Sequence, residues 1–293
     1  MTILHPMQLA VTAYLQKANK GEASMADATL DLAAEQFRHS LNRQFNDPPR
    51  EFRISLSQIG RPMCQLLHEK KGSPREDFPY SFKMNVLFGD MVEVAVKAIL
   101  LESGVAFDAS QNVVLKTPHG DVPGELDLIV KDKDDRVWDI KSCSPWAFNN
   151  KWSKGYEGLA EEDSFGYIHQ LVGYSVAQDL NPGGWIVVNK ANGEWMIVEF
   201  PQDQKIIREV LLDIYERVKI LTEYEDGPIT CAYPEVEETW YKKPTGNRHL
   251  SVICSMCPYK YEQWPNLQLA PNPKSKAREP QMRYYTHLVD ETE

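Results

Sequence analysis

The sequence lacks the features of a membrane or secreted protein. It contains no window of about 18 uncharged apolar residues, which is the length that a membrane-spanning helix needs. The N-terminus has no basic stretch followed by a long apolar run, so we expect no secretory signal and a cytoplasmic location. Internal repeats and low-complexity tracts are also absent.

An excess of positive charge is missing as well. The formal net charge is −10, which argues against a general nucleic-acid coat protein, because such a protein is basic. A nuclease is not excluded, since metal-holding carboxylates are acidic and phosphate contacts need only a local basic patch. The candidate bases for such a patch, which are otherwise solvated surface charges, are Lys70, Lys71, Arg75, Lys151 and Lys154.

Cysteine is scarce, with only five residues in the chain. An odd number in a cytosolic protein does not suggest a disulfide framework. The cysteines therefore indicate a metal or cluster site, or simply buried thiols.

What is present is ordinary for a soluble globular protein. The 293 residues are 42% hydrophobic and 25% charged, which is enough apolar material for a sizeable core in one large domain or two small ones.

Hydrophobic periodicity predicts helices that alternate with groups of strands. Residues 1–50 look helical, a helix or helix-turn-helix is expected at 55–71, and further helices are expected at 88–103, 165–178 and 202–225. Strands are expected at 113–115, 124–130, 137–142, 185–189 and 194–200. This order favours the α/β class, with a mixed central sheet flanked by helices. We expect an N-terminal helical segment (1–50), a core (51–226) and an irregular C-terminal tail (227–293) that packs back on the core.

Two of the predicted strands form a hairpin that concentrates charge. Side chains alternate along a strand, so Asp139 and Lys141 share one face, as do Glu125 and Asp127 on the preceding strand. A turn centred near Lys133 places Asp127 opposite Asp139, and Glu125 opposite Lys141. Two or three carboxylates and one amine would then meet in a small patch.

Such a patch has a chemical use. Neighbouring carboxylates repel one another unless a cation lies between them, and hard oxygen ligands suit Mg²⁺ or Mn²⁺. A bound divalent ion can polarise a phosphoryl oxygen and lower the pKa of a water, while Lys141 orients that water or stabilises charge on the phosphate. The alternative is a surface ion pair of little consequence, which most Asp-x-Lys triplets form.

The motifs together resemble the RecB-like branch of the PD-(D/E)XK nucleases. The resemblance rests on GELDLIV at 124–130, DIKS at 139–142 and the spacing of Gln170 and Tyr174, and it covers about residues 55–265. That branch orders a helical acidic or histidine residue, a G-x-x-D strand, a D/E-x-K strand and a Q-x-x-x-Y helix. The phage and CRISPR-associated exonucleases are among the similar proteins.

The resemblance assigns a role to each matching residue. It makes Asp127, Asp139 and the backbone carbonyl of Ile140 metal ligands, and Lys141 the catalytic lysine. Glu93 stands where many relatives have histidine, so it is either a further ligand or an exposed helix glutamate. Gln170 and Tyr174 lie one helical turn apart, where they brace the site, contact DNA or simply pack.

The resemblance also gives the cysteines a possible role. Some relatives hold a four-iron, four-sulfur cluster on one cysteine before the nuclease core and three after it. Cys64 and the C-x-x-C pair Cys254 and Cys257 match this arrangement, but Gln263 stands where the last cysteine is expected, and Cys231 could replace it. A cluster, a zinc ion and no metal all remain open. Cys143 reads as a small apolar filler.

These observations predict a metal-dependent DNA exonuclease that acts on single strands or duplex ends. We expect it to work in DNA recombination, repair or replication, and the resemblance is compatible with a phage protein. One alternative is an endonuclease, or a nuclease module that works with a helicase or recombinase. Another is a non-catalytic DNA-binding protein on the same fold.

Overall fold

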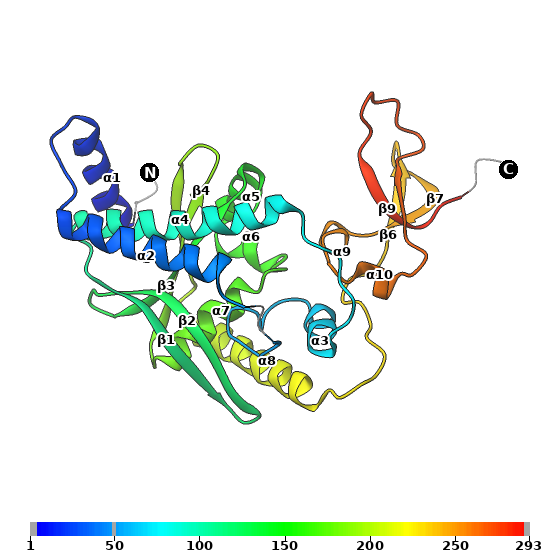
Figure 1. Cartoon of the computed structure of the whole chain (residues 1–293), viewed down its shortest axis with the longest axis horizontal. Coiled ribbons are helices and arrows are strands. Elements are labelled where there is room, and N and C mark those ends of the chain that lie inside the picture. The colour runs from blue at the N-terminus through cyan, green and yellow to red at the C-terminus, as the bar shows by residue number, and fades with distance from the viewer. Residues whose placement is uncertain (1–4, 49–50, 290–293) are drawn as a thin grey trace. The chain divides into compact units, whose positions relative to one another are not determined.

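The chain forms two compact units in a computed structural model that describes residues 5–48 and 51–289 (Figure 1). Unit 1 comprises residues 1–60 and 79–222, and unit 2 comprises residues 61–78 and 223–293. Each unit contains its own sheet.

Unit 1 is a mixed α/β structure, as the sequence predicts. Its helices are α1 (Pro6–Asn19), α2 (Asp27–Phe45), α4 (Tyr80–Glu102), α5 (Pro145–Asn150), α6 (Tyr156–Ala160), α7 (Tyr167–Ala177) and α8 (Gln204–Glu223), with a 3₁₀ turn η1 (Trp152–Lys154). Its strands are β1 (Phe107–Thr117), β2 (Gly120–Val130), β3 (Arg136–Cys143), β4 (Asn181–Asn189) and β5 (Trp195–Glu199).

The five strands form one sheet in chain order, β1-β2-β3-β4-β5. Only β3 and β4 pair in parallel, which the chain achieves by crossing over through α5, α6 and α7. The other neighbours are antiparallel. The sheet is therefore mixed.

Helices cover both faces of this sheet. On one face, α1 and α4 pack on alternate strand residues, including Leu128, Trp138 and Ile140, in the main apolar cluster. The intervening residues point to the opposite face, where α7 contacts the sheet. Helices α2 and α4 lie side by side (Figure 1). Lys141 belongs to the residues on the α7 side, because its Nζ lies 5.0 Å from the centre of the Tyr167 ring.

Two expected helix boundaries are wrong. Helix α4 of unit 1 begins at Tyr80, earlier than the predicted residue 88. The helix or helix-turn-helix expected over 55–71 is shorter, because residues 56–60 form turns and only Met63–Lys71 is helical. Pro62 explains this start, since proline disfavours helical backbone in the residue before it. The boundary expected at residue 50 falls outside the described residues.

Unit 2 contains a second sheet, so the prediction of an irregular tail is wrong. Its strands are β6 (Val236–Trp240), β7 (Lys243–His249), β8 (Gln268–Pro271) and β9 (Met282–His287), in the order β6-β7-β9-β8. Its helices are α3 (Met63–Lys71), α9 (Val252–Ser255) and α10 (Lys260–Gln263).

The second sheet is organised around a buried carboxylate. Glu238 is fully buried and accepts hydrogen bonds from Tyr285 Oη at 2.7 Å, Asn247 Nδ2 at 2.8 Å and Thr245 Oγ1 at 3.1 Å. The Nη1 atom of Arg283 lies 3.3 Å from Glu238 Oε1, the oxygen that also accepts from Tyr285. Burial alone would raise the pKa of Glu238, but the three hydrogen bonds and Arg283 hold it below the ordinary value.

Residues 61–78 belong to unit 2 and not to the predicted core. The reason is a set of contacts with the C-terminal segment. His68 Nε2 lies 2.7 Å from Gln263 Nε2, Lys260 pairs with Glu76, and the Ala232 N–H donates to Cys64 Sγ. That the C-terminal residues pack back on the core stays a prediction.

Across the described ranges, we find no helix with the length and apolar character that crossing a membrane requires.

The buried carboxylate predicts a large stability difference between neighbouring glutamates. Glu238→Ala leaves Arg283 and three hydrogen-bond donors without their acceptor, and we expect a loss of about 3–5 kcal/mol of unfolding free energy in unit 2. Urea denaturation followed by tryptophan fluorescence measures it. Glu237→Ala, at an exposed site on the same strand, is the matched control. Equal stabilities for the two variants would contradict the central role of Glu238.

Candidate active site

The site lies where strands β2 and β3 separate. Their ladder runs from Val130–Arg136 to Leu128–Trp138, and Asp127 and Asp139 are the next residues in the same register. Beyond the ladder, the Ile140 N–H donates to Asp127 Oδ2 at 2.7 Å instead of to a strand carbonyl. The fork between the strands thus aims two carboxylates at one point, as the hairpin register predicted.

Lys141 completes this group. Its Nζ lies 2.7 Å from Asp139 Oδ2, and the Asp139 side chain is fully buried. The contact is an ion pair, and neither Asp139 oxygen has a hydrogen bond of normal geometry within the described residues. Burial alone would lower the pKa of Lys141, but Asp139 and Asp127 outweigh it and raise that pKa.

Burial makes the carboxylates reluctant to ionise. It raises the pKa of Asp127 to about 7, with the charge of Asp139 as the second cause. Burial also raises the pKa of Asp139, against the opposing effect of Lys141. The charged forms of both groups therefore need a nearby cation.

Glu93 approaches this group from α4. Burial, followed by the charge of Asp127, raises its pKa. Its Oε1 lies 2.5 Å from Lys97 Nζ, one helical turn further along. The structure thus brings Glu93 to the site and does not leave it as an isolated surface residue.

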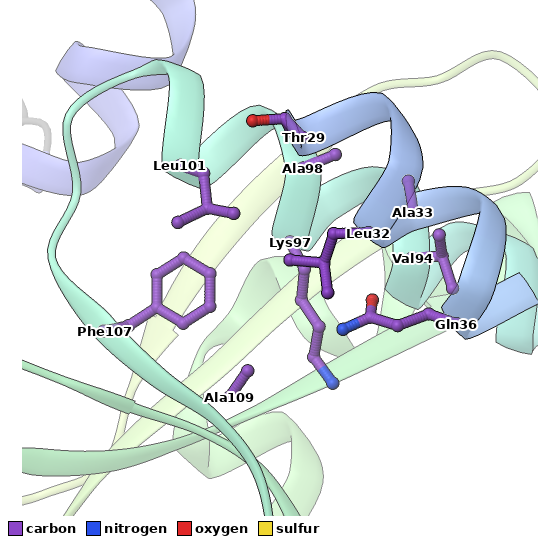
Figure 2. Close-up of a pocket in the computed structure, with 10 residues that line it drawn as sticks. All are labelled: Thr29, Leu32, Ala33, Gln36, Val94, Lys97, Ala98, Leu101, Phe107 and Ala109. Carbon is purple, nitrogen blue, oxygen red and sulfur yellow. The ribbon is translucent and has the colours of Figure 1, made fainter. Parts of the chain in front are cut away.

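Lys97 is a buried amine that the sequence reasoning missed. It is 3% exposed, and its Nζ also donates to Ser110 Oγ at 2.7 Å. Its apolar stem lines a pocket of about 190 Å³ between α2, α4 and β1, and Figure 2 shows the amine at the end away from Ala98 and Leu101. Lys97 therefore joins Glu93 to strand β1.

Ser110 occupies a strained position beside the site. The β1–β2 register of Ala109–Leu128 and Gln111–Leu126 puts it opposite Asp127, yet this one pair is missing from the ladder. Its φ of 28° is rare for a residue other than glycine. Such strain persists only where surrounding contacts impose it, and the Lys97 amine is one of them.

Helix α7 presents Tyr167, Gln170 and Tyr174 at spacings of three and seven, hence on one face. Gln170 Nε2 donates to Tyr174 Oη at 3.0 Å. Burial raises the pKa of Tyr174, and Asp139 and Asp127 contribute to the same rise. The predicted Gln–Tyr pair thus packs beside the two aspartates.

Gly124 of the GELD motif has a steric role in this packing. A Cβ at this position would lie 2.5 Å from Tyr174 Cε1 and 3.0 Å from the Leu56 Cβ. Only glycine lets the tyrosine ring approach strand β2 this closely.

Glu125 does not join the buried carboxylates, so its expected place opposite Lys141 is wrong. The β2–β3 ladder ends before it, and its side chain is 52% exposed, with Arg43 at 3.9 Å. Arg43 itself pairs with Asp90 at 3.2 Å.

The bases that the sequence offered for a basic patch are divided between the two units. Lys71 pairs with Asp226 in unit 2, and Lys154 pairs with Glu161 in unit 1. Lys151 donates to the Glu162 carbonyl. In unit 2, Arg75 lies 6.0 Å from the ring of Phe78.

A divalent cation suits the donor set of the fork. The buried Asp139 oxygens without hydrogen bonds and the ionisation cost of Asp127 are what a cation would relieve. The Ile140 carbonyl belongs to the same strand segment. Among the described residues, no group of three or more His, Cys, Asp or Glu side chains is arranged to hold a metal ion. Glu93 pairs with Lys97, and its role as a metal ligand stays a prediction.

Unit 2 gathers the four cysteines that the sequence singled out. Cys231 Sγ lies 3.4 Å from Cys254 Sγ, and the Ala232 N–H donates to Cys64 Sγ at 3.4 Å. Contact with Cys231 is the largest cause of the raised pKa of Cys64. Burial raises the pKa of Cys257 to about 11, and the charges of Cys64 and Cys231 add to the rise.

Gln263, which replaces the expected last cysteine, lies in the same unit. Its Nε2 donates to the Ile229 carbonyl at 2.9 Å and approaches His68. The chain thus brings Cys231 to the thiols, while Gln263 has a hydrogen-bonding role.

Comparisons with known proteins leave the family of the chain open. No protein-family model and no curated protein matches it. It is similar to a solved structure described as "Crystal structure of SSO0001", with 14% sequence identity and a TM-score of 0.39, over 80% of this chain and 95% of that chain. A similarity at this level does not carry a function across.

The high pKa of Asp127 predicts that the stability of the metal-free protein depends on pH. The unfolded carboxyl loses its proton near its ordinary pKa of 3.8, and the folded one only at about 7. The unfolded state therefore binds fewer protons between these values, and the unfolding free energy falls as the pH rises through them.

Asp127→Asn removes this ionisation, so the variant should gain stability relative to the wild type from about pH 4 to about pH 7 and keep the gain above. Chemical denaturation in EDTA measures it. Asp134→Asn in the exposed hairpin turn is the control. A stability difference that does not change with pH would contradict the buried-carboxyl explanation.

Proposed function

We propose that this chain is a metal-dependent DNA exonuclease of the RecB-like PD-(D/E)XK type, acting in the cytoplasm on single strands or duplex ends. The observation that carries the proposal is the fork, where Asp127, Asp139 and Lys141 converge although the first two are costly to ionise. Burying like charges together has no structural benefit without a cation. The order of the sequence motifs adds support.

Each residue has a place in the hydrolysis of a phosphodiester. Asp127, Asp139 and the Ile140 carbonyl would hold Mg²⁺ or Mn²⁺, which supplies charge stabilisation on the phosphate and a lower pKa for water. Asp139 fixes the Lys141 amine by their 2.7 Å ion pair. Lys141 in turn orients the attacking water or stabilises charge on the phosphate. Gln170 and Tyr174 brace the strand residues.

Substitution of the fork residues tests the proposal. Lys141→Ala and Asp139→Ala should each lower the rate of cleavage of end-labelled linear single-stranded DNA with Mg²⁺ by about 100-fold or more, because each removes a group that acts on the transition state. Lys133→Ala in the adjacent exposed turn should cleave like the wild type.

The same assay separates the alternatives. Full activity in both Lys141→Ala and Asp139→Ala would contradict the proposed mechanism. Cleavage of circular single strands would favour an endonuclease. Metal-independent binding without cleavage would favour a DNA-binding protein on this fold. Activity that appears only with a helicase or recombinase would favour a module of a larger complex.

We further propose that the four thiols of unit 2 hold a structural metal centre, for which they must close around the ion, because as they lie among the described residues they do not form a metal-binding group. Four thiolates around one zinc ion at about 2.3 Å lie roughly 3.8 Å apart. The 3.4 Å contact of Cys231 and Cys254 is close to this value, whereas a four-iron cluster separates its cysteines further. The contact favours zinc among the three outcomes that the sequence left open, which are an iron–sulfur cluster, a zinc ion and no metal.

Metal analysis of anaerobically purified protein tests this centre. We expect about one zinc per chain and no absorption near 400 nm. Cys64→Ser and Cys254→Ser should lose the metal, and Cys143→Ser in unit 1 should retain it. If the protein contains iron and absorbs near 400 nm, the centre is an iron–sulfur cluster and the zinc assignment is wrong. If the wild type contains no metal, the four cysteines are simply buried thiols.

A further inference from the structure

An aromatic stack leads from the surface of unit 1 to the amine of Lys141. The Phe165 and Tyr167 rings are stacked, with centroids 5.4 Å apart and an interplanar angle of 14°. Tyr167 also stacks on the buried Trp152 at 5.8 Å. Lys141 Nζ lies 5.0 Å from the centre of the Tyr167 ring. The sequence reasoning did not identify this stack.

The outermost ring is exposed although its backbone is fixed. Phe165 is 54% exposed. The segment that carries it is held by Asp163, whose carboxylate accepts hydrogen bonds from the N–H groups of Gly166, Tyr167 and Ile168 at 2.8–3.0 Å. The ring is thus presented to solvent in a defined position, so little ordering cost remains when a ligand binds to it.

The chemistry at the two ends of the stack fits one kind of ligand. A flat aromatic ring with an open surface binds a nucleobase by stacking, which contributes about 1–3 kcal/mol for each base. The Lys141 amine, one ring away, attracts a phosphate. A nucleotide carries both groups within one unit. A base can stack on Phe165 only when it has left its duplex, so the site selects single strands or frayed ends.

We propose that Phe165 is a base-stacking subsite that holds an unpaired nucleotide beside Lys141 and gives the chain its preference for single-stranded nucleic acid. This inference rests on the proposed nuclease function and adds the residue that selects the form of the substrate. Tyr167 supports the stack and connects it to the lysine.

Binding to a cleavage-deficient chain tests the subsite apart from catalysis. In an Asp139→Ala background, which removes a proposed metal ligand but keeps the Lys141 amine, the dissociation constant for a single-stranded oligonucleotide is measured by fluorescence anisotropy. Stacking is measured by the quenching of a 2-aminopurine base near the end. Adding Phe165→Ala should weaken single-strand binding about 10-fold and abolish the quenching, because one stacked base is lost. Phe165→Trp should preserve both.

A matched control and a second substrate make the outcomes distinct. Phe88→Ala, a phenylalanine on α4 that is 45% exposed, should bind like the parent chain. Binding to a blunt duplex should not change in Phe165→Ala. Unchanged single-strand binding in that variant, or equal losses for single strand and duplex, would overturn the subsite.

The proposed function fails differently. If the Asp139→Ala chain binds single strands through Phe165 but the wild type never cleaves them, the nuclease proposal falls and the subsite stands. If the wild type binds no nucleic acid, both fall. Thermal unfolding of each variant confirms that the fold is retained.

Discussion

The central constraint in unit 1 is the separation of strands β2 and β3 just beyond Leu128 and Trp138. A continued ladder would occupy the Ile140 N–H, which instead fixes the Asp127 carboxylate. The separation also leaves room for the ion pair of Asp139 and Lys141, whose amine lies over the Tyr167 ring of α7. Where β2 and β3 are paired, Leu128 and Trp138 belong to the apolar core. Where the strands separate, the buried side chains are charged.

The buried charges of the site come from several elements and must be balanced against one another. Asp127 and Asp139 on the strands, with Glu93 on α4, carry three negative charges when ionised, and the buried amines of Lys141 and Lys97 carry two positive ones. The strained backbone of Ser110 and the absent side chain of Gly124 are local features that this arrangement imposes. A stable fold by itself would be better served by apolar residues of the same size.

Much of this site follows from short-range periodicity. The alternation of Asp139 and Lys141, the hairpin between 130 and 136, and the four-residue spacing of Gln170 and Tyr174 could all be predicted from the sequence. Lys97 and Tyr167 lie one turn from Glu93 and Gln170, so the same periodicity could have found them. The backbone of Ser110 could not be predicted, because its strain comes from tertiary contacts and no residue type signals it.

The second sheet was missed for a different reason. Strands β6 and β7, such as Val236–Trp240, contain charged and polar residues and no clear apolar alternation. Their stability comes from the contacts of Glu238 with Asn247, Arg283 and Tyr285, which lie far apart in the sequence. Register set by buried polar pairs has no periodic signature, whereas register set by a hydrophobic face does.

Because unit 2 is built from two segments that are far apart in the sequence, the two units cannot be completed at the same time during translation. A ribosome releases residues 61–78 early, but their partners, from Ala232 to Gln263, emerge only after all of unit 1 has been made. Domains fold as units during translation. The fork between β2 and β3 is therefore complete in a nascent chain before Cys64, His68 and Glu76 meet their partners between residues 232 and 263, so unit 2 can close only after unit 1 has been made.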